Sequence, residues 1–237
     1  MLSDGIQALR QADNDIENII APRSEEIITL IDRYIREIEQ FNQAYSLTGT
    51  QKSEEFVIRH ILDSLAPLGI ISRLSAAAGN DERPLQTFGL QIADAGSGAG
   101  LPGIPLAVTL PDCHFTLIER MGRRAGFLWN TKAVLGLSNI TVEEGELEKT
   151  KSGRFSLVTF RAFKPLEPKL LAVLFNACTA KGIIAAYKGR REKIEREISQ
   201  FVNNKAQKQE SMTYNFEIIP YNVPFLDEER HLLIIRK

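Results

Sequence analysis

A glycine-rich segment, DAGSGAGLPG at residues 94–103, is the part of this 237-residue chain whose residue types point most directly to a binding site. Glycine is costly to order and is kept where a backbone takes a positive φ or where a ligand comes close. The segment holds four glycines behind an aspartate, more than one tight turn requires. We therefore expect a ligand to bind close to the backbone of this loop.

Two motifs overlap in the loop. GAGLPG, at 98–103, matches the dinucleotide fingerprint GxGxxG, whereas DAGSGAG, at 94–100, matches DxGxGxG, the first motif of S-adenosylmethionine-dependent methyltransferases. The preceding apolar run ends at Ala95, so the turn begins at Gly96 and the dinucleotide frame starts two residues late. The Asp94 carboxylate would repel a pyrophosphate but attract a sulfonium or an ammonium group. The sequence thus favours the methyltransferase motif.

A second acidic residue, Glu119, ends the strand-like run HFTLIE, 23 residues after Gly96. An acidic residue at the end of the second strand suits hydrogen bonding to ribose hydroxyls. Both cofactor classes use such a contact, and a solvated carboxylate with no ligand is also open. A nicotinamide-dependent oxidoreductase therefore stays as the second interpretation of the loop.

Helical patterns come first among the elements that must position the loop. Apolar residues recur three or four apart over 22–45 and 53–71, which predicts amphipathic helices. Residues 76–88 are rich in Gly, Asn, Asp and Pro and predict a loop or linker. We expect a helical N-terminal section at 1–85 and a cofactor-binding domain at 86–237.

Seven short strand-like runs follow, and helical segments alternate with the first five. The runs are 90–95, 114–119, 140–144, 155–162, 182–189, 215–223 and 231–237, and the helical segments are 102–109, about 123–136, 166–178 and 191–202. This alternation predicts an α/β fold with a parallel sheet and helices on both faces. The last two runs leave no room for a helix between them and must pair antiparallel.

Composition sets few limits on the partner. The net charge of −1 neither suggests nor excludes nucleic acid, because a basic face can be offset elsewhere. Cys113 and Cys178 lack metal-ligand spacing, and we find neither a signal peptide nor an apolar run long enough for a membrane span. We expect a cytoplasmic protein with reduced thiols, no metal and no membrane association.

The acceptor atom can be narrowed by elimination. Enzymes that methylate exocyclic amines carry an NPPY-type turn after the fourth strand, where this chain has FRAFKPL at 160–166. Carbon-5 methylation of pyrimidines needs a cysteine nucleophile, and Cys113 and Cys178 are expected away from the cofactor edge. An acceptor with its own lone pair needs neither device, so we predict no catalytic residue.

Five motifs together carry a family resemblance. They are LTGTQKSEEFVIRHILDSL (47–65), DAGSGAGLPGIPLA (94–107), RAF (161–163), YKG (187–189) and ERHLLIIRK (229–237). With them the chain resembles the 16S ribosomal RNA guanine-N7 methyltransferase G family, also called glucose-inhibited division protein B. The resemblance implies a class I methyltransferase (Rossmann-like) fold with a seven-stranded sheet, mostly parallel with an antiparallel last strand. It also implies S-adenosylmethionine as cofactor, and small-subunit ribosomal RNA or the assembled subunit as partner. A cofactor-binding, ribosome-associated module without transferase activity remains the alternative.

The resemblance also implies site residues. Cofactor contacts are expected at Gly96, Leu101, Leu147, Glu148 and Arg161, and the loop analysis adds Asp94, Gly98 and Glu119. Arg161 would contact the methionine carboxylate or an RNA oxygen. The chain departs from the family at Glu146, where an arginine is usual.

Basic residues gather in 119–132 and 187–193 and would form a footprint for RNA phosphates if they shared one face. The substrate-binding candidates are Arg59, His60, Arg123, Arg124, Lys188 and Arg190, the first two on a helix that closes the cofactor pocket in the family. Phe163 and Tyr187 either stack on a guanine or pack in the core. His114 and His231 are expected to be structural.

Overall fold

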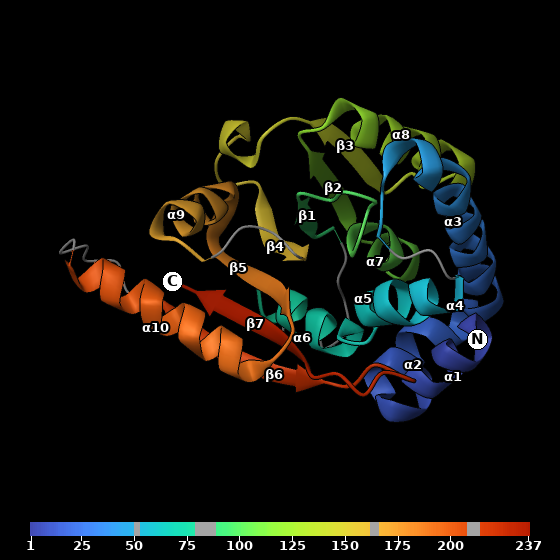
Figure 1. Ribbon diagram of the computed structural model, residues 1–237, viewed down its shortest axis with the longest axis horizontal. Coiled ribbons are helices and arrows are strands. Elements are labelled where there is room, and N and C mark those ends of the chain that lie inside the picture. Colours follow the sequence, from blue (N-terminus) through green and yellow to red (C-terminus); the bar gives the residue numbers. More distant parts are fainter. Residues whose placement is uncertain (50–52, 79–88, 162–165, 208–213) are drawn as a thin grey trace.

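The computed structural model describes residues 1–49, 53–78, 89–161, 166–207 and 214–237 (Figure 1). Within these ranges, seven strands form one sheet in the order β3-β2-β1-β4-β5-β7-β6. The strands are β1 (Gln91–Ala95), β2 (His114–Glu119), β3 (Ile140–Glu144), β4 (Phe155–Arg161), β5 (Cys178–Lys188), β6 (Asn215–Tyr221) and β7 (Arg230–Arg236). Among the described strands all pairings are parallel except those of β7 with β5 and β6, which confirms the predicted fold class.

The centre of the sheet is buried on both sides, as expected for parallel strands covered by helices. On β1, Ile92 packs into one core and Ala93 into the other. Ala93 lies level with Thr116 of β2 and Val158 of β4. The carboxyl ends of these strands therefore meet at one edge, where the glycine loop begins.

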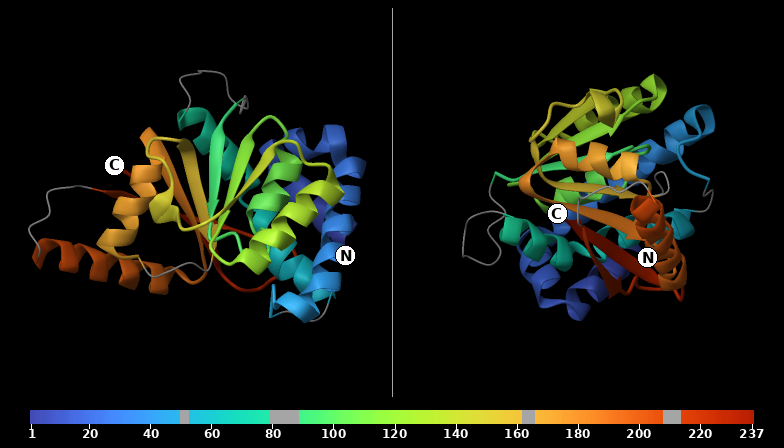
Figure 2. Two further views of the ribbon diagram at one scale, coloured as in Figure 1. Left: turned by 90° about the horizontal axis from the view of Figure 1, so that it is seen from above. Right: turned by 90° about the vertical axis from the view of Figure 1, so that its left-hand side faces the viewer.

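Helices cover both faces of the sheet (Figures 1 and 2). The first core joins the sheet to α1 (Leu2–Ala12), α2 (Asn14–Ile20), α3 (Ser24–Tyr45), α7 (Gly103–Thr109) and α8 (Gly122–Leu135). The second core joins it to α9 (Pro168–Ala177) and α10 (Arg191–Gln207). The N-terminal helices thus share one core with the strands that carry the loop.

The N-terminal section ends in an irregular helical segment. It comprises α4 (Ser53–Phe56), a π-helical turn η2 (Val57–Leu62), α5 (Asp63–Leu65) and α6 (Leu68–Ala78). Helix α6 takes up the first three residues of the predicted linker, 76–88, because its alanines continue the helix. The boundary between residues 85 and 86 lies outside the described residues and stays a prediction. In the ranges the structure describes, no helix has the length and apolar character to cross a membrane.

Candidate functional site

The glycine loop leaves β1 where the sequence predicts. The strand ends at Ala95, and Gly96 and Gly98 follow with φ angles of 70° and 59°. Other glycines of the loop serve packing, because a Cβ on Gly103 would lie 2.6 Å from Asp94 Oδ2 and one on Gly100 would strike the Ile104 side chain. Glycine is therefore needed in this loop for two reasons: some positions have a positive φ, and others leave no room for a Cβ under α7.

A cavity of about 290 Å³ opens beside the start of this loop. Four of the predicted cofactor residues line it, namely Gly96, Glu119, Leu147 and Glu148. They come from the ends of β1 and β2 and from the short helix after β3. The cavity combines a carboxylate for hydroxyl groups with apolar wall contributed by Leu147, which suits the ribose and base of a nucleoside.

Glu119 is buried and links the loop to the end of β2. Its Oε2 accepts a hydrogen bond from Gly98 N at 2.9 Å and its Oε1 accepts one from Met121 N at 2.8 Å. A carboxylate oxygen has a second lone pair. Glu119 can therefore hold the loop and still accept hydrogen bonds from a ligand in the cavity.

Asp94 lies behind the loop, and its contact with the cofactor stays a prediction. It is fully buried under α7, where Oδ2 accepts a hydrogen bond from Gly103 N at 3.0 Å. Its Oδ1 has no partner among the described residues, and burial raises the pKa of this carboxyl to about 7. Leu101 is buried as well. Among the described residues, neither Asp94 nor Leu101 lines the first cavity. Both shape the loop from behind.

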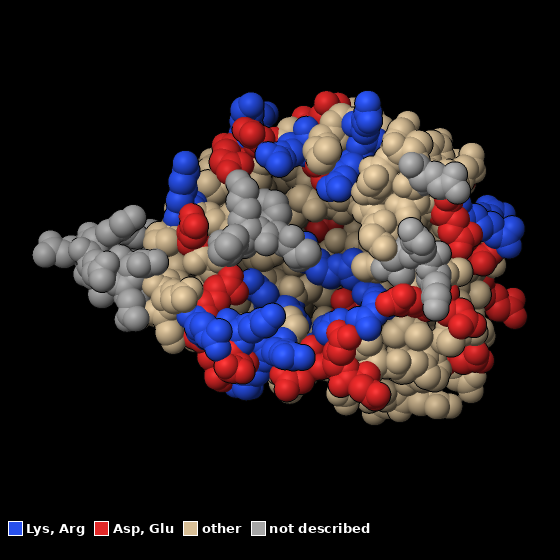
Figure 3. All heavy atoms as spheres, in the orientation of Figure 1, with Lys and Arg blue, Asp and Glu red and all other residues tan. Residues whose placement is uncertain are grey.

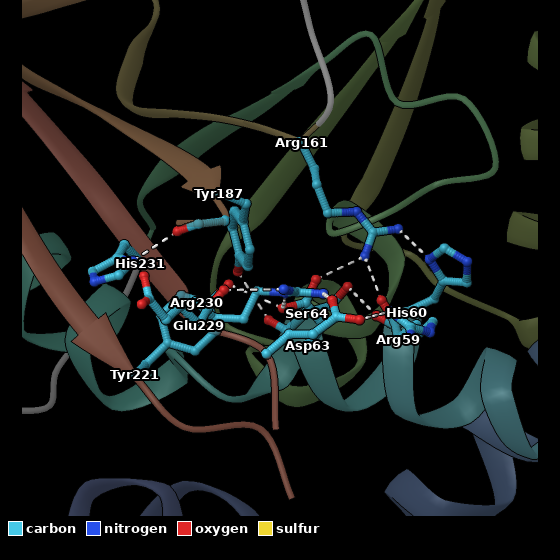
Figure 4. A network of polar contacts seen from close by, with 12 residues as sticks. Arg59, His60, Asp63, Ser64, Arg161, Tyr187, Tyr221, Glu229, Arg230 and His231 are labelled. Carbon is cyan, nitrogen blue, oxygen red and sulfur yellow. Dashed lines mark hydrogen bonds and ion pairs between the residues drawn. The ribbon is translucent and has the colours of Figure 1, made fainter. Parts of the chain in front are cut away.

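A second cavity, of about 520 Å³, lies at the carboxyl ends of β4 and β5 (Figure 4). The predicted residues Arg59, His60, Arg161 and Lys188 line it. Figure 4 shows that Arg161 reaches from the end of β4 toward the helical segment that carries Arg59 and His60. The structure thus brings one predicted cofactor residue together with three predicted substrate residues.

Arg161 is fixed by three acceptors. Its Nη1 donates to Arg59 O and to Asp63 Oδ2, both at 3.2 Å, and its Nη2 donates to His60 Nδ1 at 2.8 Å. Burial, reinforced by nearby arginines, lowers the pKa of His60 to about 4. The imidazole is therefore neutral near pH 7 and can accept the arginine's hydrogen bond.

Sequence reasoning missed Tyr221 and Arg230, which belong to the same network. Buried Asp63 also accepts a hydrogen bond from Tyr221 Oη at 3.0 Å and pairs with Arg230 Nε at 3.2 Å. Tyr221 and Arg230 stand at the two ends of the β6–β7 connection. The one available signal was that Arg230 belongs to the motif ERHLLIIRK.

The four remaining basic candidates do not share one element. Arg123 and Arg124 open α8 beside the first cavity, and Arg124 lines it. Lys188 ends β5, where its Nζ pairs with Glu197 at 2.7 Å, and Arg190 is exposed next to it. In Figure 3, Lys and Arg side chains surround a central hollow, interrupted by acidic ones. The basic candidates therefore come from separate elements around the two cavities, and their joint use as a footprint for RNA phosphates stays a prediction.

Tyr187 is buried and its hydroxyl donates to Ser64 O at 2.9 Å, and it also lines the second cavity, so its stacking on a guanine stays a prediction. Phe163 lies outside the described residues. His114 bonds Thr141 and His231 bonds Gly189 O, as expected.

The cysteines are remote from both cavities. Cys113 precedes β2 and Cys178 begins β5, and both are buried at the sheet edge opposite the glycine loop. The structural description contains no group of three or more His, Cys, Asp or Glu that could hold a metal ion.

Comparison with known proteins identifies relatives over most of the chain. A family model described as rRNA small subunit methyltransferase G matches residues 27–219. A ribosomal RNA small subunit methyltransferase G from Treponema denticola is 39% identical over 225 residues, covering 88% of this chain and 85% of that relative. The corresponding protein from Cellvibrio japonicus is 33% identical over 218 residues, covering 92% and 89%.

Solved structures agree on the fold. A candidate O-methyltransferase from Klebsiella pneumoniae superposes with a TM-score of 0.55 at 15% identity, covering 87% of this chain and 89% of that one. A candidate S-adenosylmethionine-dependent methyltransferase from Methanococcus maripaludis gives 0.52 at 14% identity, covering 86% and 91%. At such identities the likeness establishes the class I methyltransferase fold alone.

Proposed function

Because this chain belongs to the rRNA small subunit methyltransferase G family, we propose that it methylates N7 of a guanine in small-subunit ribosomal RNA. It is an S-adenosylmethionine-dependent ribosomal RNA methyltransferase, and the cofactor, when bound, supplies a methyl group carried on a positively charged sulfur. The observation that carries the cofactor assignment is the cavity between Gly96 and Leu147. We propose the cytoplasm, where ribosomal RNA is found, as its place of action.

In this proposal each wall of the first cavity holds one part of the cofactor. Glu119 accepts hydrogen bonds from the ribose hydroxyls, since its oxygens keep lone pairs beyond those used by the loop. Leu147 and Glu148 contact the adenine, and the bare backbone at Gly96 admits the methionine end. Gly98 and Leu101 shape the loop, and Asp94 acts from behind it, both by holding Gly103 N and through the charge of its carboxylate.

The second cavity is the proposed place of the target guanine. Arg161 lies at its wall with donors left beyond its three acceptors, and these can reach the methionine carboxylate or an RNA oxygen. Arg59, His60 and Lys188 line the same space. Arg123, Arg124 and Arg190 stand around the two cavities, where phosphates of the surrounding RNA would pass.

The proposed acceptor explains why no acid–base pair is needed. Guanine N7 has an in-plane lone pair and carries no proton at neutral pH, so the protein does not have to remove one. His60 is held neutral and already accepts from Arg161, so it is not poised as a base. What the chain supplies is orientation, and well-aligned reactants can gain roughly 7–11 kcal/mol from proximity.

The test is product analysis. The purified protein is incubated with methyl-labelled S-adenosylmethionine and either small-subunit RNA or assembled small subunits, and the RNA is digested to nucleosides. We expect the label in N7-methylguanosine. Label in another methylated nucleoside would contradict the N7 assignment. Cofactor binding without transfer to either substrate would favour a non-catalytic module.

A further inference from the structure

Glu228 joins two arginines from distant parts of the chain. Its Oε1 accepts from Arg59 Nη1 at 2.8 Å and its Oε2 accepts from Arg230 Nη2 at 3.1 Å. Arg59 lies in the π-helical turn, Arg230 opens β7, and both line the cavity beside Arg161 (Figure 4). Two guanidinium groups that converge on one oxyanion form the geometry that proteins use to bind phosphate.

Both arginines have a second carboxylate that keeps them in place. Arg59 Nε donates to Glu55 Oε1 at 2.9 Å, one helical turn away, and Arg230 Nε pairs with the buried Asp63 at 3.2 Å. Departure of Glu228 would therefore leave the two guanidinium groups positioned, with the Nη donors that now face Glu228 available to another anion.

Glu228 is the partner that can give way. It lies in the exposed connection between β6 and β7, and its side chain is 51% exposed against 16% for Arg230. Exposed ion pairs contribute little to stability. A turn in the same connection places Phe225 at φ 65°, a left-handed conformation that favours glycine and strains a bulky residue. Hydrogen bonds from Arg59 and Arg230 hold the pKa of Glu228 below its usual range, so it remains an anion.

We propose that Arg59 and Arg230 form a binding site for an RNA backbone phosphate, and that Glu228 occupies this site until RNA displaces it. The inference rests on the proposed function, which brings RNA to this edge of the sheet. Phosphate contacts fix the position of a nucleic acid without reading its sequence. The site would therefore hold the strand at the mouth of the cavity while the target base enters it.

The test compares two variants that each remove one negative charge from the same connection. Glu228→Gln frees the two arginines, whereas Asp227→Asn changes an exposed neighbour. We expect Glu228→Gln to bind small-subunit RNA about threefold to tenfold more tightly by fluorescence anisotropy, and Asp227→Asn to change the affinity less than about twofold. Thermal midpoints near that of the unmodified protein establish that both variants fold.

A double variant separates a phosphate site from a simple structural tie. In an Arg59→Gln background, Glu228→Gln should lose most of its gain, because one of the two phosphate donors is gone. If Glu228→Gln binds RNA no better than Asp227→Asn, or more weakly, Glu228 is a structural tie and the inference is wrong.

An RNA unrelated to the small subunit distinguishes this inference from the proposed function. Phosphate binding is independent of sequence, so the gain in Glu228→Gln should persist with that RNA. Methylation of small-subunit RNA without this gain overturns the phosphate site and leaves the proposed function standing. The gain without any methylation supports the phosphate site and overturns the proposed function.

Discussion

The phenol of Tyr34 donates a hydrogen bond of 2.7 Å to the carbonyl oxygen of Ala99, although the two residues are 65 positions apart. Tyr34 is fully buried in α3, and Ala99 lies inside the glycine loop. The N-terminal helices therefore do more than cover the sheet. They hold the loop whose start lines the proposed cofactor cavity.

Tyr34→Phe should weaken both the fold and cofactor binding. The substitution leaves Ala99 O buried without its donor, which costs about 1–3 kcal/mol. We expect a lower free energy of unfolding in urea and a several-fold weaker S-adenosylmethionine affinity. Thr29→Ala, which removes an exposed hydrogen bond to Glu25 O on the same helix, is the control and should change neither. Equal behaviour of the two variants would mean that the link to the loop is unimportant.

Asp94→Asn should change stability and cofactor affinity in a pH-dependent way. Burial raises the pKa of Asp94 to about 7, so between pH 4 and 7 the folded protein holds a proton that the unfolded chain has lost. The free energy of unfolding contributed by this group therefore falls as the pH rises through that window. Above pH 7, Asp94→Asn should therefore have a higher thermal midpoint than the unmodified protein, because the variant buries no charge at this position.

Above pH 7 the same substitution, Asp94→Asn, should weaken cofactor binding even though it stabilises the fold. At pH 8 the carboxylate is charged and attracts the sulfonium, so the variant should bind S-adenosylmethionine more weakly than the unmodified protein. At pH 6 the carboxyl is mostly protonated, and the two should bind alike. Calorimetric titrations at both pH values check this, and an identical difference at pH 6 and pH 8 would remove Asp94 from the electrostatics of the site.

The rate of methyl transfer should be nearly flat from about pH 6 to 8.5 in single turnovers at saturating cofactor. No proton leaves guanine N7, and the pKa of His60, about 4, lies below the range. Asp94, with a pKa of about 7, titrates inside the range but affects cofactor binding, which saturation removes from the measured rate. The outcome against this account is an acid limb of about tenfold per pH unit that disappears in His60→Gln or Glu119→Gln. Such a limb would identify a general base.

Salt dependence should separate the basic residues that contact RNA from those already paired. Arg123 is exposed, and Arg123→Gln should lower the slope of log affinity against log salt by about one unit or slightly less. Lys188 is paired with Glu197, so Lys188→Gln should change the slope less. Filter binding across a salt series measures both, and equal slopes would show that the pairing has no effect on RNA binding.

Local sequence patterns were sufficient to predict the strands of the sheet and the place where the glycine loop begins. The apolar run at 90–95 and the glycine at 96 located the end of β1, and alternating strands and helices predicted the sheet. Such signals depend on neighbours along the chain. The burial of Asp94 under α7 was not evident from the motif, because motif spacing gives a residue type but no direction, although strand alternation places it on the same face as Ile92.

Local sequence patterns could not predict which residues from distant parts of the chain meet in the second cavity. Asp63 meets Arg161 and Arg230 because β7 inserts between β5 and β6, an order that no single segment specifies. The π-helical turn at 57–62 reads as an ordinary helix in its apolar spacing. The pairing of Arg59 with Glu228 likewise depends on how the β6–β7 connection returns to this turn.

The most direct test of the cofactor assignment is calorimetric titration of Gly145→Leu with S-adenosylmethionine. Gly145 lines the first cavity, its φ lies outside the left-handed region, and a Cβ there meets nothing within 4 Å. The added side chain should therefore fill the cavity without straining the fold. Gly126→Leu, at an exposed and equally unobstructed position of α8, is the matched control, and Gly189→Leu enters the second cavity instead. We predict that Gly145→Leu abolishes cofactor binding while the other two retain it. If Gly145→Leu binds S-adenosylmethionine as tightly as the unmodified protein does, the first cavity is not the cofactor site.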